Sequence, residues 1–139
     1  MKNRSERGFT LIELIIVMVL LGILAAVAVP RMTSSIQSAE ENAEQKFMAD
    51  LVSALEIYAT DEFVENSVKS YPADPFDALD REPNGSWSFV EFLGTGDNPE
   101  IQHTRNDNSS HEWEYVVTAP NGGNHGSYTL LGPGYGTGY

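Results

Sequence analysis

The chain has 139 residues, no cysteine and a formal net charge of −12. A chain of this length holds at most one globular domain once an apolar N-terminal segment is set aside, and its strongly acidic character argues against general nucleic-acid binding. Without cysteine, the chain forms neither disulfides nor thiolate metal sites.

The N-terminal region combines a short basic leader with a long apolar stretch. Residues 1–8 hold three basic side chains and one acidic one, and residues 9–30 are almost entirely apolar. About 20 apolar residues are enough for a helix to cross the hydrocarbon of a bilayer. We therefore predict a transmembrane helix over residues 9–30, with the basic leader in the cytoplasm. A cleaved signal peptide and a plain signal anchor share part of this pattern.

A single carboxylate, Glu13, lies inside the apolar stretch. A charged side chain at this depth costs on the order of 2.5–3.5 kcal/mol by insertion scales, and neither a signal peptide nor a plain anchor needs one. The whole stretch RGFTLIELIIVMVLLGILAAVAVP, residues 7–30, resembles the N-terminus of type IV pilins and of the pseudopilins of type II secretion systems. The shared features are a leader ending in glycine, then phenylalanine, then Thr-Leu-Ile-Glu and a long apolar run.

This resemblance implies a processed filament subunit. A prepilin peptidase would cleave between Gly8 and Phe9 and methylate the new amino group of Phe9, so that residues 1–8 are a leader peptide. The cationic amine can then pair with Glu13 of the same chain or of a neighbouring subunit, since opposite charges attract strongly where the dielectric is low. The resemblance also implies that Gly22 and Pro30 let the helix extend in a filament; Pro30 by itself predicts a weak point.

The implied partners are the peptidase, the lipid bilayer, an inner-membrane assembly platform, and copies of the chain with other pilin-like subunits. The implied location is the bacterial inner membrane, with a C-terminal head in the periplasm, and then a periplasmic or extracellular filament. A single-pass membrane protein with a periplasmic binding head that never polymerises remains the alternative. The sequence leaves open a pilus or a secretion pseudopilus, and a major or a minor subunit.

Residues 31–65 continue the helical pattern as an amphipathic half of the same helix. Apolar residues recur every three or four positions, and Glu40, Glu41 and Glu44 fall off this stripe. The predicted stripe consists of Met32, Ile36, Ala39, Ala43, Phe47, Leu51, Leu55 and Tyr58. The helix is expected to end at about Glu65.

Residues 66–139 are predicted to form a globular head with a small antiparallel sheet, which makes the fold α+β. We expect an irregular connection over 66–85, a strand or short helix over 86–93, a surface loop over 94–111, and a hairpin from HEWEYVVTA and GSYTLLG. The large aromatic side chains are expected in the core of the sheet: Trp87, Trp113, Tyr115 and Tyr128.

The head shows no pattern of a catalytic or metal site, so we expect no enzyme and no cofactor. His103, His111 and His125 fall in segments predicted as polar loops, without the spacing of a zinc site. Asp74, Asp77, Asp80 and Glu82 cluster near three prolines; a solvated acidic turn is favoured there over a calcium site. No acidic residue follows Glu114, whereas pseudopilins usually carry an acidic calcium-binding C-terminal loop and many type IV pilins a disulfide.

Overall fold

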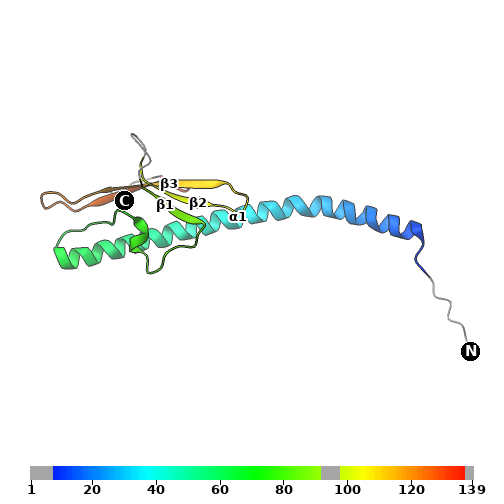
Figure 1. Cartoon of the computed structure of the whole chain (residues 1–139), viewed down its shortest axis with the longest axis horizontal. Helices are drawn as coiled ribbons and strands as arrows, with labels where there is room; N and C mark the ends of the chain where they lie inside the picture. Colours follow the sequence, from blue (N-terminus) through cyan, green and yellow to red (C-terminus); the bar gives the residue numbers. More distant parts are fainter. Residues whose placement is uncertain (1–7, 92–97, 137–139) are drawn as a thin grey trace, which may run out of the picture. The chain divides into compact units, whose positions relative to one another are not determined.

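The computed structural model of the chain describes residues 8–91 and 98–136 (Figure 1). The chain divides into two compact units, residues 1–41 and residues 42–139. We call the second unit the head unit and describe each unit by itself.

One long helix, α1, runs from Leu11 to Asn66. Its end lies one residue beyond the predicted position. From Leu11 to Ala39, every apolar side chain that the structure describes is exposed. The first unit therefore has no hydrophobic core of its own among its described residues.

The head unit adds a short 3-10 helix and a five-stranded sheet to the last part of α1. The 3-10 helix, η1, spans Pro75–Ala78, and the Asp74 carboxylate caps it by accepting a hydrogen bond from the Phe76 N–H at 2.8 Å. The strands pair antiparallel in chain order, and Figure 1 shows the sheet alongside the cyan-to-green part of α1. They are β1 (Trp87–Val90), β2 (Glu100–Thr104), β3 (Ser110–Thr118), β4 (Ser127–Gly132) and β5 (Tyr135–Gly136).

The α+β class and the hairpin, which is formed by β3 and β4, are confirmed. The segment 86–93, left open between strand and helix, contains the strand β1. The prediction of a loop over 94–111 is wrong, because it misses β2 and the first residues of β3. β2 carries only one apolar residue, Ile101, on its inner face, and a histidine takes the second buried position. β2 pairs with both β1 and β3, although its sequence shows no clear alternating hydrophobic pattern.

The core lies between α1 and the inner face of the sheet. Alternate residues of β3 and β4 point inward, as expected for a sheet with one covered face. The buried cluster consists of Met48, Leu51, Leu55, Ile101, Trp113, Tyr115, Tyr128 and Leu130. The predicted aromatic core is therefore confirmed for three of its members, while Trp87 packs against the cluster from a partly buried position.

The predicted apolar stripe of α1 is only partly correct. Leu51 and Leu55 are buried, but Ala43 is exposed, and the buried line is completed by Met48, Ala59 and the acidic Glu44. The sequence pattern places Glu44 on the polar face instead. A carboxylate tolerates burial only with hydrogen-bonding and charged partners, and these come from β2, from Arg105 just after it and from the beginning of β3.

Candidate processing and assembly site

The helix α1 begins with a reciprocal side-chain cap. The Thr10 N–H and hydroxyl both donate to Oε2 of Glu13 at 2.8 Å, and the Glu13 N–H donates to the Thr10 hydroxyl oxygen at 3.3 Å. This is a capping box, in which a threonine and the glutamate three residues later satisfy N–H groups that the first turn leaves without partners. Sequence reasoning considered Glu13 as an ion-pair partner and missed this second role, although the pattern Thr-x-x-Glu indicates it.

The predicted cleavage position lies just outside this cap. Gly8 and Phe9 precede the helix in a stretch without regular structure, and the Phe9 side chain is 90% exposed. No heavy atom of the described chain comes within 4 Å of a Cβ built on Gly8, apart from its chain neighbours. An exposed, non-helical peptide bond is the kind of segment that peptidases cut.

The Glu13 side chain also borders an apolar groove on the first turns of α1. The groove encloses about 350 Å³ and is lined, besides Glu13, by Phe9, Leu14, Val17, Met18 and Leu21. α1 is the one helix of the described chain that is long and apolar enough to cross a membrane, and no part of its apolar window is buried by the chain itself. This helix is consistent with membrane anchoring.

The helix is continuous through Gly22 and Pro30. Just after Pro30, side-chain hydroxyls return to backbone carbonyls one turn back: Thr33 to Val29 at 3.2 Å and Ser35 to Arg31 at 3.0 Å. Such hydroxyl bonds often accompany bends in helices. The flexibility implied for these two positions stays a prediction.

A second polar site lies inside the head unit, around the carboxylate of Glu44. Arg105 donates from Nε to Oε1 at 2.8 Å and from Nη2 to Oε2 at 2.7 Å, which is a bidentate pair. Nδ1 of His103 lies 2.8 Å from Oε1, and Nδ1 of His111 lies 3.0 Å from Oε2. Glu44 is only 3% exposed, so this cluster connects α1 to β2, to Arg105 after it and to β3 around one buried carboxylate.

The surroundings of Glu44 keep it ionised. Burial alone would raise the pKa of this carboxyl, but hydrogen bonds from Arg105 and His103, together with the positive charge around His111 and Arg105, outweigh burial and lower the pKa to about 2. The Glu44–Arg105 pair joins α1 to the residue after β2, and the best-attested role of a buried ion pair is to specify the register between elements.

The structure corrects the placement of two histidines. His103 lies in β2 and His111 in β3, not in loops. His125 does lie in the connection before β4, where its Nδ1 accepts a hydrogen bond from the Lys69 N–H at 3.1 Å. Within residues 8–91 and 98–136, no group of three or more histidine, aspartate or glutamate side chains is placed to hold a metal ion. The calcium interpretation of the acidic segment thus gains no support from the described residues.

Comparisons with known proteins agree with the resemblance of the N-terminus. A family profile described as "Prokaryotic N-terminal methylation motif" matches residues 3–29. The type II secretion system core protein G of Vibrio cholerae serotype O1 is 31% identical over 136 residues, which cover 96% of this chain and 75% of the relative. The type II secretion system core protein G of Pseudomonas aeruginosa is 35% identical over 88 residues, covering 62% of this chain and 58% of the relative.

A pilus protein is also similar. The type IV wide pilus major component PilA4 of Thermus thermophilus is 38% identical over 58 residues, covering 42% of this chain and 44% of the relative. The matches to four core protein G relatives span only 43% to 62% of the relatives' own length. No solved structure matches the chain. One core protein G relative matches 96% of this chain, and the N-terminus carries the methylation motif. The chain therefore belongs to the family of type IV pilins and type II secretion pseudopilins.

Proposed function

We propose that the chain is a structural subunit of a type II secretion pseudopilus. It is made as an inner-membrane precursor, cleaved between Gly8 and Phe9, methylated on the Phe9 amine and polymerised through the N-terminal helix. The observation that carries the proposal is Glu13, a carboxylate at the start of an apolar helix that its own chain leaves exposed. The number of core protein G relatives favours the secretion system over a surface pilus.

The geometry of the cap supports a pairing of Glu13 with an amine. Both hydrogen bonds from Thr10 go to the same oxygen, Oε2. An ionised carboxylate has about four lone-pair sites, so Glu13 retains acceptor capacity for a further donor. Cleavage would supply that donor as the Phe9 amine. Such a pair between two subunits would set the axial stagger of neighbouring helices, because each charge left alone in lipid is penalised.

The proposed processing and assembly also imply the partners and the location of the chain. Its partners are the prepilin peptidase, the inner-membrane assembly platform, the lipid bilayer, and copies of the chain with other pilin-like subunits. The head would lie in the periplasm before assembly, since the basic leader favours the cytoplasmic side. The described residues supply no catalytic constellation, and the proposed role needs none.

The processing step is tested with Gly8→Ala in the full chain, co-expressed with the peptidase. We expect the unchanged chain to lose the mass of residues 1–8 and to gain one methyl group, and the variant to keep its leader. Intact-protein mass spectrometry separates the two products. Removal of the leader from the variant at the wild-type rate would contradict the proposed cleavage.

The assembly step is tested with Glu13→Ala, Glu13→Gln and Thr10→Ala. Glutamine keeps a capping-box partner but removes the charge, and Thr10→Ala removes the cap but keeps the charge. If the charge pairs with an amine, both Glu13 variants insert into the membrane and fail to enter filaments, while Thr10→Ala still assembles. Sheared filaments and membrane fractions are compared by immunoblotting. Normal assembly of Glu13→Ala would contradict the pairing of Glu13 with an amine, whereas absence of the unchanged chain from filaments would favour the non-polymerising membrane protein.

A further inference from the structure

The outer face of the sheet carries acidic side chains without basic partners. In the strand register, Glu100 of β2 is opposite Glu114 of β3, and Glu114 is opposite Leu131 of β4. Glu112 lies two residues before Glu114 and shares its face. These four residues and Gly132 line a shallow hollow on the sheet.

This arrangement is unfavourable in a single chain. Like charges directly opposite each other on neighbouring strands destabilise a sheet. The side-chain partners of these carboxylates are neutral amides, Asn98 for Glu114 at 3.2 Å and Gln102 for Glu112 at 3.4 Å. No ion pair to Glu100, Glu112 or Glu114 occurs within residues 8–91 and 98–136. Leu131, which is 39% exposed, lies directly opposite Glu114 on this face. We call Glu100, Glu112, Glu114 and Leu131 the acidic patch.

A groove lies elsewhere on the head unit, between α1 and the segment after η1. It encloses about 370 Å³, and Ile57 in its wall is 64% exposed. Arg81 and Asp80 also line it, and the other lining residues are apolar: Ala54, Ala78 and Leu79. We call this the Ile57 groove. Its apolar residues offer contact area to an aliphatic side chain.

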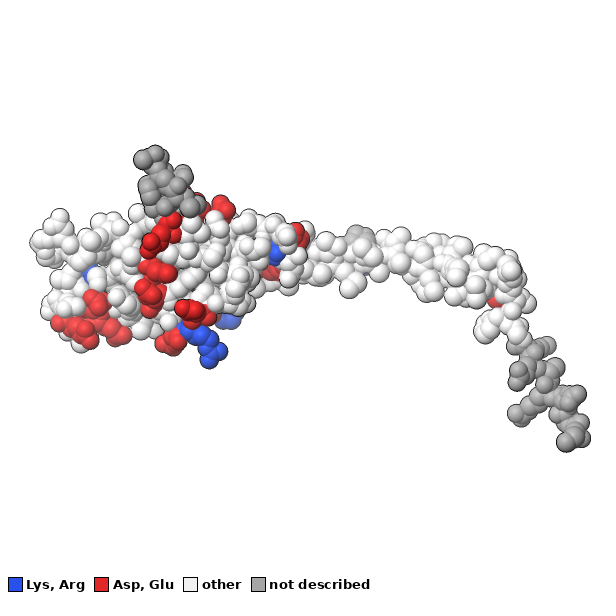
Figure 2. Space-filling view, viewed as in Figure 1, with Lys and Arg blue, Asp and Glu red and all other residues white. Residues whose placement is uncertain are grey.

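Arg81 is the basic residue of this groove, and among the described lysines and arginines of the head unit it is the one without an ion pair. Lys46 pairs with Asp50, Lys69 with Glu56, and Arg105 with Glu44. Arg81 is exposed and has no ion pair within the described residues. Acidic side chains outnumber basic ones on the visible face of the head unit (Figure 2), so an unpaired arginine beside an apolar groove stands out.

We infer that the acidic patch of one copy docks against the Ile57 groove of a second copy, with Leu131 against Ile57 and with Arg81 against Glu112 and Glu114. The two surfaces complement each other because Leu131 meets the apolar residues of the groove and the neighbouring carboxylates meet Arg81. Asp80 is the one groove residue of like charge. Docking brings a cation to carboxylates that lack one. This inference rests on the proposed filament function and names the contact between its heads.

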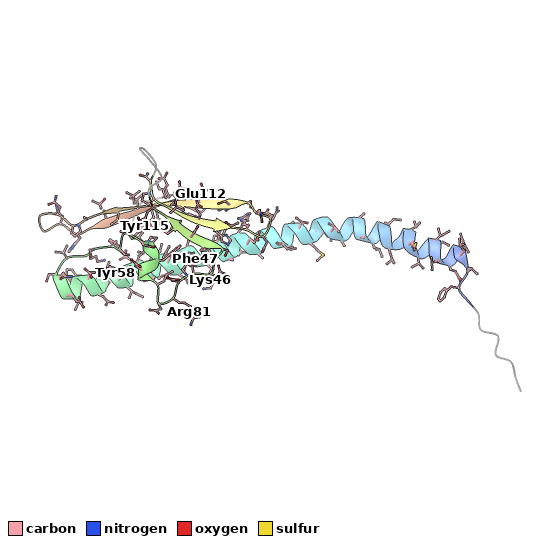
Figure 3. The ribbon with its side chains drawn as sticks, viewed as in Figure 1. Lys46, Phe47, Tyr58, Arg81, Glu112 and Tyr115 are labelled. Atoms are coloured by element: carbon pink, nitrogen blue, oxygen red, sulfur yellow. The ribbon has the colours of Figure 1, made fainter. Side chains whose placement is uncertain are left out.

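The positions of the two surfaces determine what such a contact builds. Figure 3 shows Glu112 on the sheet side of the head unit and Arg81 on the far side of α1. One chain therefore cannot satisfy its own groove. Two different surfaces that meet head to tail form a heterologous contact, which repeats into an open helical assembly unless the rotation closes a ring. The contact thus fits a filament better than an isolated dimer.

Cysteine cross-linking tests the contact directly, since the chain has no cysteine of its own. Full-length Ile57→Cys, Leu131→Cys and the variant with both changes are expressed with the peptidase and the assembly platform, and filaments are oxidised. We expect a ladder of cross-linked multimers from the double variant, dimers from a mixture of the two single variants, and monomers from each single variant alone. Both positions are exposed, so the changes leave the core intact.

Two outcomes would overturn the inference. The first is normal filaments of the double variant without a ladder, which would leave the proposed function standing. The second is a dimer from Leu131→Cys alone, which would mean that the sheet faces pair symmetrically. Adding Glu13→Ala to the double variant should abolish the ladder, because the contact forms only in filaments.

A charge swap gives a second, independent test. Arg81→Glu, and Glu112→Lys combined with Glu114→Lys, should each reduce filament yield at least about tenfold, since like charges across an interface are strongly repulsive. Combining all three changes should restore it. Glu65→Lys is the control for reversing one acidic charge, because it makes the same change as each of the two glutamate substitutions, at an exposed residue on neither surface. Failure of the combined variant to recover, with a normal melting temperature, would contradict the inference.

Discussion

The two units of this chain use one helix in opposite ways. Between Leu11 and Ala39 every described apolar side chain of α1 is exposed, whereas between Glu44 and Ala59 nearly every turn buries one against the sheet. The first stretch begins with a run that is apolar almost all round, whereas the second carries one periodic apolar face. Apolar surface on a helix therefore shows that the helix needs a partner, but not whether the partner is the chain's own sheet, a lipid or another subunit.

The largest expected difference between the units concerns one carboxylate. Glu44→Ala removes the ion-pair partner of a guanidinium that is only 9% exposed, and breaking a buried pair in this way costs about 3–5 kcal/mol. Glu41→Ala, three residues earlier on the exposed helix, should change stability by less than about 0.5 kcal/mol. The measurement is urea denaturation of the full chain in detergent, followed by the fluorescence of Trp87 and Trp113, which both lie in the head unit.

Two methionines of α1 allow the two units to be compared with the same type of side chain. Met48 is fully buried and Met32 is 65% exposed. Met48→Ala should lower the free energy of unfolding of the head unit by about 2–4 kcal/mol, because it leaves a cavity in the core. Met32→Ala should leave that free energy unchanged in the same denaturation experiment. Equal losses in both variants would show that the exposed part of α1 contributes to the stability of the head unit.

The sequence predicts the elements of this chain better than their contacts. The long helix and the β3–β4 hairpin follow from strong periodicity, and residues 7–30 carry the family assignment. β2 was missed because its inner face holds Ile101 and a histidine instead of two apolar residues. A buried histidine needs a polar partner, and that partner comes from a residue far away in the sequence.

The residues of the candidate sites also differ in whether local sequence predicts them. Gly8, Phe9 and Glu13 were proposed from local sequence, because a cleavage motif and a carboxylate in an apolar run are local signals. The cluster around Glu44 joins residues 59 to 67 positions apart. Its members are ordinary polar residues of a helix, two strands and the connection between those strands, so only the folded chain reveals them. Arg105 was not singled out for the same reason.

A glycine in the sheet provides a smaller effect in the head unit. A Cβ added at Gly132 would collide with the ring of Trp113 and lie 2.8 Å from the Glu112 carbonyl oxygen. Gly132→Ala should therefore destabilise the head unit by about 1–3 kcal/mol, as overpacking does. Gly85→Ala is the control, since no heavy atom lies within 4 Å of its added Cβ, and it should be neutral or slightly stabilising. Thermal unfolding monitored by near-ultraviolet circular dichroism reports both.

The stability of the head unit should also depend on acid. The pKa of Glu44 falls from 4.5 to about 2 on folding. A carboxyl whose pKa is lowered by folding stabilises the native state above its unfolded pKa, and this contribution is lost as the pH falls toward the folded value. The stability difference between the unchanged chain and Glu44→Gln should therefore be constant above about pH 5 and shrink between about pH 4.5 and pH 2. Denaturation curves of both proteins at several pH values give this difference. A difference that stays constant down to pH 2 would mean that the Glu44 carboxyl loses no more charge in the unfolded chain than in the folded one, and that its partners do not favour the ionised form.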